Sequence, residues 1–79
     1  MNPDRRKKID EAAELIGQAK TLLEIARDEE RDAFENLPEG IQQSEKGERI
    51  EQAAEKLDEI VDAIDTLEGD LSEANGEPA

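Results

Sequence analysis

The chain has 79 residues, of which 42% are charged and only 1% aromatic, and its formal net charge is −13. This length allows one small domain, and the absence of cysteine and histidine excludes disulfides, thiol nucleophiles, imidazole bases and zinc sites of the usual kind. So strong an excess of acid opposes contact with nucleic acid or anionic membranes and favours a basic partner.

The first predicted helix runs from about residue 3 to residue 36. Its start is well marked, because Asn2 is suited to cap the helix, Pro3 to its first position and Asp4 to the positive end of the helix dipole. Apolar residues then recur at alternating steps of three and four, the pattern of a helix with one buried stripe. In heptad letters the stripe occupies positions a and d, and every d position is alanine. The residues of the stripe are Ile9, Ala12, Ile16, Ala19, Leu23, Ala26, Glu30, Ala33 and Leu37.

The connection between the helices is predicted over residues 37–44. Pro38 disfavours a helical conformation at the residue before it and therefore ends the first helix. Ser44 is suited to cap a second helix over about residues 45–72. Residues 73–79 are predicted to fray as a polar tail.

The second predicted helix carries the same stripe without a break. Its a and d positions hold Ile50, Ala53, Leu57, Ile60, Ile64, Leu67, Leu71 and Ala74. The two stripes predict an all-α fold, an antiparallel two-helix hairpin with the packing of an alanine-rich coiled coil. A register in which facing residue numbers sum to 83 sets every alanine against a larger residue. Glu30 is the one carboxylate in the first stripe, and its predicted partner is a base of the second helix such as Arg49.

A single stripe between two helices buries too little apolar area to offset the entropy of the chain, so a further contact is expected. We name the residues suited to it the apolar strip: Leu15, Leu22, Ile25, Ala54 and Val61. The strip is expected to dimerise the hairpin into a four-helix bundle or to dock on a different protein. Both uses remain open at this point.

Six carboxylates repeat at helical spacing on the outer side of the second helix. We name them the acidic rail: Glu48, Glu51, Glu55, Asp58, Asp62 and Asp65. Residues 37–79 hold only three bases against thirteen acids, so little positive charge is available nearby. One interpretation is a mimic of a nucleic-acid strand that occupies a basic channel of another protein. The other is a solvated face that keeps the hairpin in solution.

No motif in the sequence indicates a catalytic, cofactor or metal site. Residues 62–70 lack the ligand spacing and central glycine of an EF-hand loop, and a diiron site in a helical bundle requires histidine. We therefore expect no enzymatic activity, no cofactor and no bound metal.

Residues 28–48 read D-E-E-R-D-A-F-E-N-L-P-E-G-I-Q-Q-S-E-K-G-E and precede an acidic helix that contains L-D-E-I-V-D-A-I. This half of the chain resembles a group of small acidic helical proteins of bacteriophages and prophages, mostly uncharacterised. The resemblance carries no catalytic motif. It implies a phage accessory protein, and small acidic phage proteins include inhibitors of host defence.

The expected function is that of a non-enzymatic, acidic protein-interaction module that binds and blocks a basic, nucleic-acid-handling host protein as a nucleic-acid mimic. The alternative is a structural homo-oligomer, or an adaptor that docks through the apolar strip. The expected partners are a basic protein and a second copy of the chain, without direct contact to nucleic acid. No apolar run approaches the ~20 residues of a membrane span, so we expect a cytoplasmic location, in the bacterial host if the chain is phage-encoded.

Overall fold

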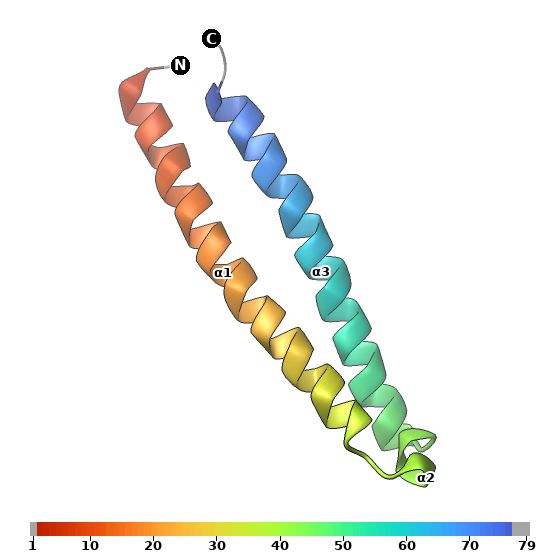
Figure 1. Cartoon of the computed structure of the whole chain (residues 1–79). Coiled ribbons are helices and arrows are strands. Elements are labelled where there is room, and N and C mark those ends of the chain that lie inside the picture. Colours follow the sequence, from red (N-terminus) through yellow and green to blue (C-terminus); the bar gives the residue numbers. More distant parts are fainter. Residues whose placement is uncertain (1, 77–79) are drawn as a thin grey trace.

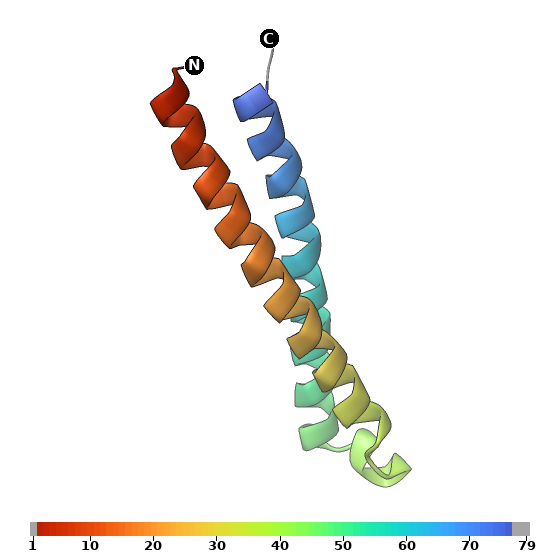
Figure 2. The same ribbon diagram turned by 60° about the vertical axis from the view of Figure 1, so that its left-hand side comes forward.

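The structure, a computed structural model, describes residues 2–76. These residues form three helices, α1 (Pro3–Glu35), α2 (Glu39–Gln42) and α3 (Glu45–Gly76), and no strand. The two long helices lie antiparallel and side by side, with the start of α1 and the end of α3 at one end of the rod and α2 at the other (Figure 1). The rod measures 58 × 15 × 13 Å. The predicted all-α hairpin is therefore confirmed, and the view in Figure 2 shows the same pairing from a second side.

The first helix begins as the sequence predicts. The backbone N–H of Arg5 donates to Oδ1 of Asn2 at 2.9 Å, which satisfies one of the free donors at the start of the helix. Pro3 occupies the first turn, and Asp4 adds negative charge at the positive end of the helix dipole. The helix ends at Glu35, where Asn36 forms the C-cap two residues before Pro38.

The connection is held by polar contacts to backbone carbonyls. The side-chain amide of Gln42 donates to the carbonyl oxygen of Phe34 at 3.0 Å and so satisfies an acceptor at the end of α1. Ser44 accepts from the backbone N–H of Gly47 at 3.4 Å, which is the capping role predicted for it. Gly47 is buried against α2, and a Cβ atom there would overlap the carbonyl oxygens of Ile41 and Gln42. Only glycine fits this close approach.

The second long helix extends beyond its predicted end. Residues 73–76 are helical rather than frayed, while residues 77–79 of the predicted tail lie outside the described residues. A cross-helix contact explains the extension, since Nδ2 of Asn75 donates to Oδ1 of Asp10 at 2.7 Å. This hydrogen bond fastens the last turn of α3 to α1.

The helices meet along heptad positions a and e, so the prediction of an a and d interface is wrong. Within residues 2–76 the buried apolar side chains are Ala54 and Val61, which are 4% and 3% exposed and both occupy e. The a positions Leu23 and Leu57 are half-buried beside them. Most d positions are exposed instead: Ala19, Ala33, Ala53, Ile60, Leu67 and Ala74.

The register also differs from the predicted one. The polar side-chain contacts between the long helices all join residues whose numbers sum to more than 83. Lys20–Asp65, Arg27–Asp58 and Asp10–Asn75 sum to 85, Lys20–Glu68 sums to 88 and Arg31–Asp58 sums to 89.

Charge and side-chain size account for both corrections. The apolar stripe of α3 is three positions wide around Ala54 and Val61, where position e is apolar beside a and d, whereas one neighbouring helix can cover only part of it. The e side offers glycine and alanine for close approach, and it sets the bases of α1 against the acids of α3. Packing on this side closes ion pairs across the interface that packing on the d side would leave open.

Candidate interaction surfaces

One side of the hairpin carries a ladder of cross-helix ion pairs, which we name the ion-paired side. Nζ of Lys20 pairs with Asp65 and lies 3.2 Å from Oε1 of Glu68. Nη1 of Arg27 lies 3.0 Å from Oδ1 of Asp58, and these partners hold both bases against α3. Hydrogen bonds to Asp65 and Glu68 raise the pKa of Lys20 above its ordinary value. The ladder joins α1 to α3 along this side.

The acidic rail runs along the outer edge of this side and is only partly neutralised. Asp58 also receives Arg31, whose Nη2 lies 3.3 Å from Oδ2, so Asp58 and Asp65 both belong to the cross-helix ladder. The remaining four rail residues are exposed and form no ion pair among residues 2–76: Glu48, Glu51, Glu55 and Asp62. The rail is therefore four exposed carboxylates interrupted by two paired ones.

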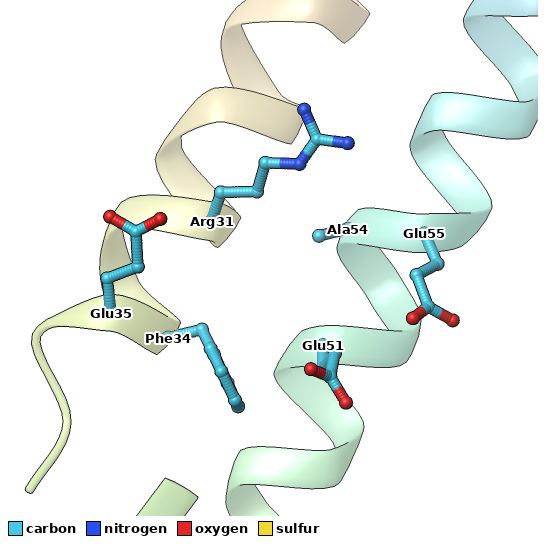
Figure 3. Close-up of a pocket in the computed structure, with 6 residues that line it drawn as sticks. All are labelled: Arg31, Phe34, Glu35, Glu51, Ala54 and Glu55. Atoms are coloured by element: carbon cyan, nitrogen blue, oxygen red, sulfur yellow. The ribbon is translucent and has the colours of Figure 1, made fainter. Parts of the chain in front are cut away.

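A hollow of about 360 Å³ opens between the helices near the α2 end, and Figure 3 shows its lining. The ring of Phe34 projects from α1 toward α3, next to Glu51. The full lining is Arg31, Phe34, Glu35, Glu51, Ala54 and Glu55. Sequence reasoning missed this hollow, although the single phenylalanine, at an e position three residues before the connection, was a usable signal. Chemically, an aromatic ring beside one carboxylate, in a lining that holds three acids and one base, is suited to the side chain of a lysine or arginine.

The apolar strip does not exist as one surface. Leu15, Leu22 and Ile25 are exposed by 65%, 68% and 50%, as the strip requires. Ala54 and Val61 are instead the most buried apolar residues of the described chain, so their assignment to the strip was wrong. They were misplaced because position e lies inside the interface of this hairpin and not beside it.

The exposed d positions create a different apolar surface. Each residue turns a helix by about 100°. With positions a and e in the interface, position d therefore lies on one flank of it and position b, which holds Arg31, Asp58 and Asp65, lies on the other. In an antiparallel pair the d flanks of both helices lie on the same side of the hairpin. Two leucines at the neighbouring position g of α1 extend this surface. We name the whole surface the apolar face: Leu15, Ala19, Leu22, Ala53, Ile60 and Leu67. Ile60 and Leu67 are 38% and 44% exposed on it.

The interface carboxylate lacks its predicted partner. Glu30 is half-buried between the helices as expected, but Arg49 pairs with Glu45 of its own helix at 2.6 Å. Residues 2–76 contain no group of three or more acids placed to hold a metal ion. Across the same residues, no helix has both the length and the apolar character to cross a membrane.

Comparisons with protein-family models, with curated proteins and with solved structures found no match for this chain. The resemblance of residues 28–48 to phage proteins therefore stays a prediction, as does the expected lack of enzymatic activity. Three features of the hairpin are suited to contact with another molecule: the hollow, the exposed part of the acidic rail and the apolar face.

Proposed function

We propose that this chain is a non-enzymatic interaction module that binds a basic protein through the exposed carboxylates of α3. The observation that carries the proposal is the hollow, where the ring of Phe34 lies next to Glu51 and where Glu35, Glu55 and Arg31 complete the charged lining. A lysine or arginine of the partner would lay its aliphatic stem on the ring and direct its charge to the carboxylates.

The charge of the surrounding surface supports the same partner. Residues 37–79 have a net charge of −10, from three bases and thirteen acids, and rail residues Glu48 and Asp62 extend the acidic surface on either side of the hollow. A surface of this kind accelerates encounter with a basic protein and disfavours nucleic acid itself. The partner we propose is a nucleic-acid-handling protein of a bacterial host, which a phage-derived chain would block in the cytoplasm by imitating a nucleic-acid strand.

Capture from a bacterial lysate at low and high ionic strength tests this proposal. The immobilised wild-type chain should retain basic proteins at low salt and release them at high salt, because exposed charges are screened. The double variant Glu51→Gln/Glu55→Gln should lose them. The matched variant Glu11→Gln/Glu14→Gln removes the same charge from exposed positions of α1 and should retain them. Equal retention by both variants would contradict the proposal.

A second candidate function uses the apolar side chains for docking. The chain would then be a structural homo-oligomer, in the form of a dimer that makes a four-helix bundle, or an adaptor that docks on another protein. The exposure of Leu15 and Leu22 favours this candidate. Docking of another protein on apolar side chains would persist at high salt and would be lost on Leu22→Gln, so the same capture experiment separates the two candidates.

A further inference from the structure

The described hairpin half-buries the a positions of its apolar stripe and leaves most d positions exposed. Four large side chains of the apolar face are exposed, namely Leu15, Leu22, Ile60 and Leu67, while only Ala54 and Val61 are buried. A contiguous apolar face along a rod is a surface that binds another molecule, because isolated apolar residues on a surface are ordinary but an aligned row of them is not.

The total exposed area of the chain exceeds that of a compact monomer by about the area that one partner buries in a dimer. The chain exposes 5738 Å², whereas a compact monomer of 8.8 kDa exposes about 4,800 Å². The excess of roughly 900 Å² is close to the ~800 Å² that each partner buries in a stable interface of standard size. One further copy of this hairpin would therefore bring the exposed area per chain to its usual value.

The charges that border the apolar face permit contact between two copies. The border lies at heptad position g, which also holds apolar residues. Its charged residues are three bases and two acids: Lys8, Arg49, Lys56, Glu29 and Asp70. The border is nearly neutral although the chain carries −13. Most acids lie elsewhere, so two apolar faces can meet without setting one acidic rail against another.

Side-chain size makes the apolar face complementary to itself. The d row of α1 is entirely alanine, whereas the d row of α3 contains Ile60 and Leu67. A two-fold axis parallel to the helices sets α1 of one copy against α3 of the other at equal height. In the register of the Lys20–Asp65 and Arg27–Asp58 pairs, residues at equal height have numbers that sum to about 85. This brings Ala19 near Leu67 of the second copy and Glu29 near Lys56. Small residues meet large ones, and opposite charges meet at the border.

We propose that the apolar face binds the same face of a second copy of this chain, with α1 of each copy against α3 of the other. This inference rests on the homo-oligomer candidate and does not depend on a basic partner. The hollow and the acidic rail lie on the opposite side of each hairpin. The dimer therefore presents two acidic hollows that face away from each other, and it combines both candidate functions in one assembly.

Sedimentation equilibrium of the purified chain tests the proposal. The wild-type protein should have twice the 8.8 kDa mass of one chain. Leu22→Gln/Leu67→Gln should sediment as a monomer, whereas Ile25→Gln changes an exposed isoleucine outside the apolar face and should remain dimeric. Glu51→Gln/Glu55→Gln should also remain dimeric, which separates this inference from the proposed acidic binding site. A monomeric wild-type chain would overturn the proposal.

Two further measurements cover the case in which the double variant unfolds, and they also test the arrangement. The wild-type melting temperature should rise with protein concentration, since association stabilises the folded chain; a melting temperature independent of concentration would overturn the proposal. The chain has no cysteine, so single cysteines can be introduced at Ala19 and Leu67. A mixture of Ala19→Cys and Leu67→Cys should form a mixed disulfide. Disulfide formation by Ala19→Cys alone would overturn the arrangement.

Discussion

The ion-paired side and the apolar face of this hairpin differ in whether their side chains find partners within the chain. On the ion-paired side, Lys20 and Arg27 reach from α1 to acids of α3 and close the interface. On the apolar face, Leu22 of α1 and Leu67 of α3 contact solvent. The comparison indicates that electrostatics selects which part of a wide apolar stripe the hairpin covers, and that the other part stays exposed.

The largest expected effect comes from placing a charge inside the hairpin interface. Val61→Asp would bury an unpaired carboxylate at one of the two most buried apolar positions, and it should destabilise the fold by roughly 3–5 kcal/mol. Thr66→Asp adds the same charge at an exposed position of α3 and should have a small effect. Urea unfolding followed by circular dichroism measures both, and comparable losses would refute the assignment of Val61 to the interface.

A second expected effect concerns the glycines of α3. Gly47→Ala would drive a methyl group into the carbonyl oxygens of Ile41 and Gln42 and should cost about 1–3 kcal/mol. Gly69→Ala meets nothing nearby and should stabilise the helix by up to about 1 kcal/mol. Thermal unfolding of the two variants should shift in opposite directions, and a shift in the same direction would show that α2 does not pack against Gly47.

The ion-paired side should respond to pH in a defined direction. Because the folded chain raises the pKa of Lys20 above 10.5, the stability from its charge is complete below that value and is lost as the pH rises through the folded-state pKa. Lys20→Met removes this contribution, so its melting temperature should fall less than that of the wild type between neutral and strongly alkaline pH. Lys46→Met, at an exposed position, is the control. Identical profiles for the wild type and Lys20→Met would argue against the ladder.

The smallest expected effect lies on the exposed part of the acidic rail. Asp62→Ala relieves repulsion from neighbouring carboxylates and should be neutral or stabilising by a few tenths of a kcal/mol. The same substitution at Asp58, another residue of the rail, should have the opposite effect. Its two cross-helix arginines indicate a loss of stability instead. Melting temperatures at low salt compare the two variants, and a larger loss for Asp62→Ala would invert the description of the rail.

The hairpin itself could be predicted because local signals mark it without ambiguity. Asn2 and Pro3 define the start of α1, Pro38 its end and Ser44 the start of α3, and each acts through its immediate neighbours. The packing of the helices could not be read in the same way. A heptad pattern identifies a stripe but not which flank of it meets the neighbouring helix, and that choice depends on pairs such as Arg27 and Asp58 that are distant in sequence.

Ala54 and Val61 were wrongly assigned to the apolar strip for the same reason. Position e flanks the stripe in the sequence pattern, and the pattern does not say whether α1 covers the e flank or the d flank. The hollow escaped prediction because Phe34 and Glu51 come together only in the observed register. The exposed members of the rail were predicted correctly as outward residues, because their spacing alone places them away from the stripe.

The measurement that tests this account most directly compares thiol reactivity at two adjacent positions of α3. Single cysteines at Ile60 and Val61 report on the apolar face and on the hairpin interface, in a chain that has no other thiol. The account predicts that Val61→Cys is protected at every protein concentration, whereas Ile60→Cys reacts readily in dilute solution and becomes protected as the chain dimerises. Protection of Ile60→Cys at all dilutions, or equal reactivity of the two cysteines throughout, would contradict it.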